Sequence, residues 1–219
     1  MSPTPLQEKN RVVFAVAGSG KTSSLIEEAL SRSDKRILFV TYTTENLLNI
    51  EKSFAERIGF TPENVKIKSW FTWLLSDWVR PYHNFISSGS RVSTINFVNG
   101  SIWSNFSRRS IPESDTERYY FDRERRIYTD KISEYSFKCN NISGDLVIKR
   151  LEAQYDCIFI DEVQDLAGWD LELIKLLFNS KMEVILVGDP RQVIYLTNHS
   201  SKNSRYKAEK IVNLFIELE

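Results

Sequence analysis

Residues 11–22 read RVVFAVAGSGKT, and this stretch decides the fold because an apolar, strand-like run leads directly into a glycine-rich turn. The turn has the pattern Ala-x-x-Gly-x-Gly-Lys-Thr, so Ala15 stands where the common phosphate-binding loop has its first glycine. Gly18 and Gly20 let the backbone turn so that its N–H groups point inward at phosphate oxygens. The alternative is a glycine-rich turn that happens to precede a lysine.

The residues of this loop have distinct expected roles. Lys21 is expected to reach the β and γ phosphates of ATP, and the hydroxyl of Thr22 to hold Mg²⁺. The predicted cofactors are therefore ATP and Mg²⁺. The predicted nucleotide contacts are Ala15, Val16, Ala17, Gly18, Ser19, Gly20, Lys21, Thr22 and Ser23, together with Gln192 further along the chain.

Apolar runs and helix-period segments alternate around this loop. The further runs are RILFVT (36–41), NVKIKS (64–69), DCIFID (156–161) and EVILVG (183–188). Nearly continuous apolar runs are typical of parallel strands that are covered on both faces. Between them, apolar residues recur at spacings of three and four after Thr44 and after Asp165. This order predicts an α/β fold with a parallel sheet and a ligand at the carboxyl ends of its strands.

Two polar turns follow predicted strands, as a phosphate site requires. FIDEVQD (159–165) delivers Asp161 as a second Mg²⁺ ligand and Glu162 as a general base that orients the attacking water. The alternative, an exposed acidic turn, does not explain why both acids follow a strand. LVGDPRQVIY (186–195) places Asp189, Arg191 and Gln192 at the same edge, where Gln192 can bond the γ-phosphate and the water. The predicted catalytic residues are Lys21, Glu162 and Gln192.

Residues 81–150 interrupt the alternation and predict a small inserted subdomain. An Asn-Gly pair in INFVNGSIWSNF (95–106) indicates a hairpin, whereas 129–140 and 144–154 have helical patterns, the second with Asp145 as its cap. The predicted division is therefore 1–80 with 151–219 as the nucleotide domain and 81–150 as the insertion.

Composition excludes some classes of protein. The chain has 29 basic and 29 acidic residues, so any nucleic-acid contact is expected in a local groove rather than through net charge. Its two cysteines cannot form a metal cluster, and Cys157 is expected to be a buried, reduced thiol. The start MSPTPLQEKN lacks the features of a signal peptide, and no apolar run is long enough to span a bilayer, so a cytoplasmic protein is expected.

The motifs together resemble superfamily 1 helicases of the UvrD/Rep type, which move along single-stranded DNA. The resemblance lies in AVAGSGKT (15–22), VTYTTEN (40–46), KSWFTWLL (68–75), DEVQD (161–165) and GDPRQVIY (188–195). It implies the first, ATP-binding RecA-like domain of such a motor, a P-loop NTPase fold with a parallel sheet flanked by helices.

The resemblance also implies a DNA path with aromatic rings that stack on bases without reading sequence. The residues that it places there are Thr41, Tyr42, Thr43, Ser69, Trp70 and Tyr195. The alternative for Trp70, Phe71, Trp73 and Trp78 is a stripe that faces the core, and this alternative is favoured for Phe71 and Trp73.

The chain departs from the family pattern in several places. Thr44-Glu45 replaces Asn-Lys, Phe71 replaces histidine, and LTNHS (196–200) replaces the segment with a second stacking aromatic. The upstream glutamine motif that reads adenine is missing or shortened, and Gln7, 14 residues before Lys21, is a candidate for it. The second RecA-like domain, with its arginine finger, does not follow in this sequence. The resemblance therefore implies slow ATP hydrolysis unless a second RecA-like domain is supplied in trans. It also implies a nuclease as a partner, in phage defence or repair.

Two functions of different classes remain open at this point. One is a DNA-stimulated ATPase, the motor half of a helicase. The other is a nucleotide-gated module in which ATP only switches affinity for DNA or a partner. The sequence favours the ATPase because Glu162 is needed only for hydrolysis.

Overall fold

The computed structural model describes residues 9–16, 18–89, 91–97, 111–191, 202–206 and 210–218. Within this part, five parallel strands form one sheet in the order β1-β7-β6-β2-β3. They are β1 (Arg11–Phe14), β2 (Ile37–Thr41), β3 (Val65–Ser69), β6 (Cys157–Ile160) and β7 (Glu183–Gly188). All five apolar runs of the sequence are therefore strands, and the predicted α/β fold with a RecA-like parallel sheet is confirmed.

The strand order reverses at the centre of the sheet. The chain runs from β1 across to β2 and β3, and later returns to insert β6 and β7 between β1 and β2. Open α/β sheets bind ligands at such a switch point, just beyond the carboxyl ends of the strands. The order thus brings the ends of β1, β6 and β7 to neighbouring positions.

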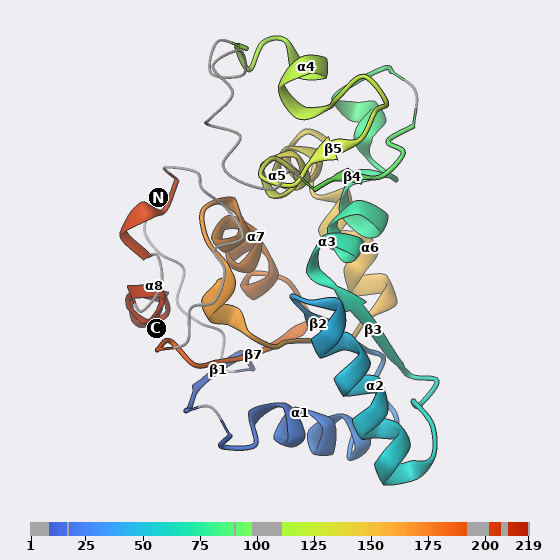
Figure 1. Ribbon diagram of the computed structural model, residues 1–219, viewed down its shortest axis with the longest axis vertical. Helices are drawn as coiled ribbons and strands as arrows, with labels where there is room; N and C mark the ends of the chain where they lie inside the picture. The colour runs from blue at the N-terminus through green and yellow to red at the C-terminus, as the bar shows by residue number, and fades with distance from the viewer. Residues whose placement is uncertain are drawn as a thin grey trace. The chain divides into compact units, whose positions relative to one another are not determined.

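Helices α1 (Lys21–Leu30) and α2 (Thr44–Ile58) cover one face of the sheet (Figure 1). They contribute Leu25, Ile26, Ala29, Ile50 and Phe54 to one buried cluster. Alternate residues of the strands complete it, including Phe39, Phe159 and Ile185, as the two-residue period of a strand requires. Cys157 is buried in this cluster, as predicted.

Helices α7 (Trp169–Phe178) and α8 (Ile211–Leu218) pack together beside the sheet. The ring of Phe215 in α8 lies 5.9 Å from Phe14 in β1 and 5.9 Å from Phe178 in α7. The sequence predicted helical spacing from Leu166 onward, but the helix begins at Trp169. Residues Val163–Asp165 form a short 3₁₀ turn, η4, before it.

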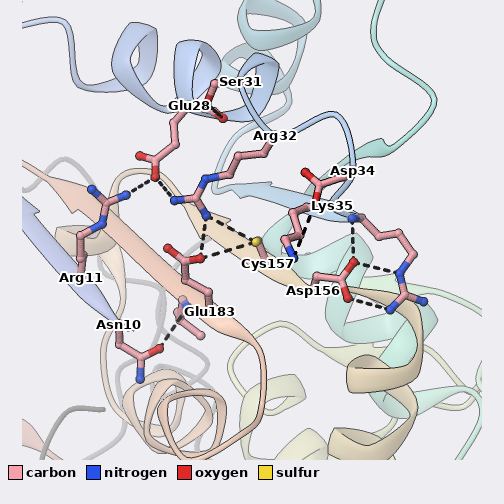
Figure 2. A network of polar contacts seen from close by, with 12 residues as sticks. Asn10, Arg11, Glu28, Ser31, Arg32, Asp34, Lys35, Asp156, Cys157 and Glu183 are labelled. Carbon is pink, nitrogen blue, oxygen red and sulfur yellow. Dashed lines mark hydrogen bonds and ion pairs between the residues drawn. The ribbon is translucent and has the colours of Figure 1, made fainter. Parts of the chain in front are cut away.

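Arginine pairs tie α1 to the amino-terminal edge of the sheet (Figure 2). Arg32 pairs with Glu28 in α1 and with Glu183, the first residue of β7, at 2.6 Å for the second pair. Glu28 also pairs with Arg11, the first residue of β1. Helix and strands are therefore joined at the edge opposite the phosphate loop.

The chain divides into two compact units, Met1–Trp70 with Ile148–Glu219 and Phe71–Val147. The second unit contains an aromatic core that includes Tyr120, Phe121 and Tyr135, and α5 packs there against η1. Its elements are η1 (Leu74–Val79), η2 (His83–Phe85), β4 (Ile95–Asn96), α4 (Thr116–Tyr120), β5 (Ile127–Tyr128) and α5 (Ile132–Ile142). Helices α3 (Trp70–Trp73) and α6 (Leu146–Gln154) cross the limits of the units, and η5 (Ser204–Tyr206) belongs to the first. The division at 80/81 and 150/151 stays a prediction.

Two local predictions in residues 81–150 have different outcomes. Helices α5 and α6 match the predicted segments, but the carboxylate of Asp145 accepts a hydrogen bond from the Asn140 amide at 2.7 Å. The Asn-Gly turn at 99–100 lies outside the described residues. The described start of the segment 95–106 forms β4, which pairs in parallel with β5. The sequence did not indicate this pairing.

Candidate nucleotide-binding and active site

The predicted phosphate loop connects β1 to α1 at the carboxyl edge of the sheet. Gly18 and Gly20 adopt φ angles of 75° and 82°, which favour glycine, and Gly20 is the cap residue of α1. A β-carbon built on either would meet no described atom within 4 Å, so the loop is open on that side. The N–H of Ala15 donates to the carbonyl of Gly188 at 3.1 Å and so ties the loop to the end of β7. Ala17 lies outside the described residues.

Lys21 is the first residue of α1, and its side chain turns back over the loop. Its Nζ donates to the carbonyls of Ala15 at 2.9 Å and Val16 at 3.1 Å. An ammonium group held only by neutral carbonyls can turn to phosphate oxygens, which bind it more strongly. The other predicted contacts, Ser19 and Ser23, are exposed at the same loop and helix end.

Thr22 and Asp161 meet although 139 positions separate them. Thr22 Oγ1 donates to Asp161 Oδ2 at 2.5 Å, and Asp161 follows β6 directly. A hydroxyl and a carboxylate in contact are the donors that Mg²⁺ takes beside nucleotide phosphates. No group of three or more His, Cys, Asp or Glu residues suited to a metal ion occurs in the described part of the chain. An ion at this place would therefore need phosphate or water oxygens as well.

The carboxyl group of Asp161 is buried, with 4% of the residue exposed. Burial raises its pKa to about 6, and the neighbouring charge of Glu162 acts in the same direction, against the hydrogen bond from Thr22. A cation at this carboxylate would reverse that effect. The residues thus fit a magnesium ion in both donor chemistry and charge.

Glu162 occupies an unusual backbone position at the end of the same strand. Its φ of 60° and ψ of 42° are left-handed, which is uncommon outside glycine. Its N–H donates to Asp161 Oδ1 at 2.9 Å, and its carboxylate accepts a hydrogen bond from Gln164 Nε2 at 2.6 Å. The side chain is half-buried next to Asp161, where a general base for an attacking water is expected.

Gln164 is the residue that sequence reasoning missed. It lies inside the quoted motif DEVQD, but a motif does not indicate which of its members bond each other. In the structure Gln164 is 1% exposed, and its Oε1 also accepts from the N–H of Asp189 at 3.0 Å. It therefore links the ends of β6 and β7.

The turn after β7 is described only as far as Arg191. Asp189 is buried and accepts from the N–H of Arg191 at 3.1 Å and from its guanidinium at 3.4 Å. Two predicted site residues, Gln192 and Tyr195, lie outside the described residues, as does Gln7.

The residues predicted for a DNA path separate into two groups. Thr41 and Trp70 are 0% and 1% exposed, and the Trp70 indole donates to Asp170 Oδ1 at 3.1 Å. Both side chains are inaccessible to a DNA strand in this conformation. Tyr42, Thr43 and Ser69 are partly exposed just beyond or at the ends of β2 and β3, and Thr43 caps α2. The core-facing alternative accounts for Trp70, and also for Phe71, Trp73 and Trp78.

This geometry is that of a RecA-like domain in which a glycine-rich loop and an acidic strand end are in contact. Residues 120–208 match the family described as "UvrD/REP helicase N-terminal domain", which confirms the resemblance to UvrD/Rep-type helicases. The matched range includes β6 and β7 but not the phosphate loop, whose assignment depends on its own geometry.

A curated relative of the same kind is similar over most of the chain. It is "F-box DNA helicase 1" from Gallus gallus, 24% identical over 232 residues. The match covers 84% of this chain but only 22% of the relative. In the described residues, no helix has the length and apolar character needed to cross a membrane.

Proposed function

We propose that this chain is the ATP-binding motor domain of a UvrD-like DNA helicase and that it couples ATP hydrolysis to binding and translocation of single-stranded DNA. The observation that carries the proposal is the hydrogen bond from Thr22 to Asp161. It joins the start of the phosphate-loop helix to the acidic end of β6, the two parts that a magnesium triphosphate would bridge.

In this proposal the chain's own residues bind and orient the nucleotide. Lys21 leaves the loop carbonyls for the β and γ phosphates, while backbone N–H groups and the start of α1 face the same anion. Thr22 and Asp161 hold Mg²⁺, which supplies charge neutralisation on the phosphates. Glu162 takes a proton from the attacking water, and Gln192 senses the γ-phosphate.

Tyr42, Thr43 and Ser69 are the proposed DNA contacts that are partly exposed in the structure. They lie at the carboxyl ends of β2, the strand adjacent to β6, and of β3, the strand next to β2. A second RecA-like domain, either in trans or in another part of a longer protein, would supply the arginine finger, and a nuclease is a proposed partner. An arginine finger raises phosphoryl-transfer rates about 10³- to 10⁵-fold, so turnover by this chain alone is expected to be slow.

The test is ATP turnover and nucleotide affinity with and without single-stranded DNA, for the wild type, Lys21→Ala and Glu162→Gln. Lys21→Ala should weaken ATP affinity about 10- to 100-fold, the loss expected for charge-assisted hydrogen bonds. Glu162→Gln should retain affinity and lose turnover. Lys35→Ala is the matched control, because Lys35 is an exposed lysine at the opposite edge of the sheet.

Two results would contradict the proposal. ATP affinity that is the same in Lys21→Ala and Lys35→Ala would exclude the phosphate loop as the binding site. Binding of ATP and DNA without hydrolysis, even when a second RecA-like domain is added, would instead favour the nucleotide-gated module.

A further inference from the structure

A fully buried polar side chain connects the two strand ends that carry the acidic site residues. Gln164 is 1% exposed and forms one hydrogen bond in each direction. Its Nε2 donates to Glu162 Oε2 at 2.6 Å, and its Oε1 accepts from the N–H of Asp189 at 3.0 Å. The side chain therefore spans from the end of β6 to the turn after β7.

The chemistry at both ends fixes the orientation of this amide. The backbone N–H of Asp189 is a donor and needs the carbonyl oxygen, whereas the carboxylate of Glu162 is an acceptor and needs the NH₂ group. A reversed amide would leave both contacts unsatisfied in a buried place, which is costly. Glutamine meets both requirements, and glutamate would meet only the first.

Gly188 leaves the space that Gln164 occupies. A β-carbon at Gly188 would lie 2.4 Å from Gln164 Oε1 and 2.8 Å from Val163 Cγ1, closer than real contacts allow. The same glycine accepts the hydrogen bond from Ala15 at the start of the phosphate loop. The three strand ends around the site are thus in direct contact through Gly188 and Gln164.

The backbone of Glu162 needs such support. A left-handed conformation in a residue other than glycine costs on the order of 1–3 kcal/mol and persists only where neighbours hold it. The carboxylate of Glu162 is half-buried, and Gln164 is the side chain that holds one of its oxygens. Loss of that bond would let the carboxylate rotate while the phosphate loop stays as it is.

We propose that Gln164 is a positioning residue that holds the Glu162 carboxylate for water activation and ties its position to the turn after β7. This inference rests on the proposed ATPase function. It assigns to Gln164 a part in the hydrolysis step and none in nucleotide binding, because it contacts the base and not the phosphate loop.

The test separates kcat from KM for ATP. Gln164→Leu should lower kcat about 10- to 100-fold, the range expected when a reacting group is misplaced, with KM and nucleotide affinity unchanged. Gln164→Glu is the second variant, since it keeps the shape and the bond to Asp189 and loses the donor to Glu162. Gln164→Glu should lower kcat to a similar degree. If Gln164→Leu does not fold, this second variant still tests the inference.

A double-mutant cycle shows whether Gln164 acts through Glu162. In the Glu162→Gln background, Gln164→Leu should change single-turnover hydrolysis by about twofold or less, because the group that it positions is already gone. Independent, multiplied losses in the double variant would mean general structural damage and would overturn the inference.

Gln154→Leu is the matched control. Gln154 ends α6 at the amino-terminal side of β6, and its buried Oε1 has no hydrogen-bond partner in the described part of the chain. The Gln154→Leu substitution should leave kcat for ATP unchanged. An unchanged kcat in Gln164→Leu and Gln164→Glu, beside a slowed Glu162→Gln, would overturn this inference alone. Absence of turnover in the wild type with DNA and a second domain would overturn the proposed function as well.

Discussion

The two edges of the sheet differ in how their charged side chains are paired. At the amino-terminal edge, charges form pairs: Arg32 lies between Glu28 and Glu183 (Figure 2). Arg36 pairs with Asp156 at 2.9 Å. The hydrogen bond to Glu183 raises the pKa of the Arg32 guanidinium above its usual value. This edge stabilises the fold.

At the carboxyl edge, the two acids of the candidate site are held close together outside ion pairs, whereas Asp189 pairs there with Arg191 at 3.4 Å. Neither Asp161 nor Glu162 forms an ion pair with a residue that the structure describes, although the two are adjacent in sequence. Their hydrogen bonds come from a hydroxyl, a backbone N–H and an amide. Paired charges stabilise the amino-terminal edge, whereas adjacent acids outside ion pairs fit a site for a cationic ligand.

The same substitution at both edges tests this difference most strongly. Glu162→Gln should lower kcat for ATP about 10²- to 10⁴-fold, the range for loss of a general base. Glu183→Gln should leave kcat unchanged, because Glu183 contacts Arg32 and not the site. Steady-state turnover with single-stranded DNA, measured well below the unfolding midpoint of each variant, makes the comparison. Equal losses in the two variants would remove the distinction between the edges.

The reverse order is expected for stability. Glu183→Gln should reduce the free energy of unfolding by about 1–2 kcal/mol, since Arg32 loses a charged partner at a place that is only one-quarter exposed. Glu162→Gln should change it less. Urea denaturation of both variants in nucleotide-free buffer measures the difference. A more stable Glu183→Gln protein would show that the pair at this edge contributes nothing.

Asp161→Asn should stabilise the magnesium-free protein. The pKa of Asp161 is raised to about 6, so the folded state binds this proton more tightly than the unfolded state, and its stability falls as pH rises from about 4 through 6. A neutral amide removes that loss at neutral pH. We expect an unfolding midpoint roughly 2–4 °C higher near pH 7, as about 1 kcal/mol produces at this size, with reduced ATP turnover. A lower midpoint would indicate that the Thr22 bond outweighs the burial of charge.

The sequence predicted the sheet almost to the residue because buried parallel strands leave continuous apolar runs. The run 36–41 became β2 and the run 183–188 became β7, with all but one of their strand residues buried. The candidate phosphate loop and the candidate role of Asp161 could be proposed from the sequence for a related reason. Their chemistry depends on residues that are adjacent in sequence and that follow a strand end.

Burial and long-range contacts were not predictable in the same way. A motif resemblance gives Trp70 a position but not its surroundings, and the structure buries its indole against Asp170, 100 positions away. Gln164 escaped notice because one of its partners is a backbone N–H 25 positions away. Such contacts exist only once the sheet has formed. The parallel pairing of β4 with β5 is of the same kind.

The smallest expected effect lies at the exposed part of the amino-terminal edge. Hydrogen bonds from the side chain and the backbone of Arg36 lower the pKa of Asp156 to about 2, below its unfolded value of about 3.9. The unfolded state then binds more protons between these values, so stability rises with pH across that window and is fully present above it. Asp156→Asn should therefore be less stable than the wild type near pH 5, lose about half of that difference by about pH 3 and lose most of it by about pH 2. Asp34→Asn, on an exposed side chain of the same edge, is the control, and urea midpoints at low salt are the measurement.

Because the Arg36 pair is half exposed, added salt should reduce the Asp156 difference. A difference that persists unchanged at about pH 3 would mean that the side chain stabilises the edge by packing rather than by charge.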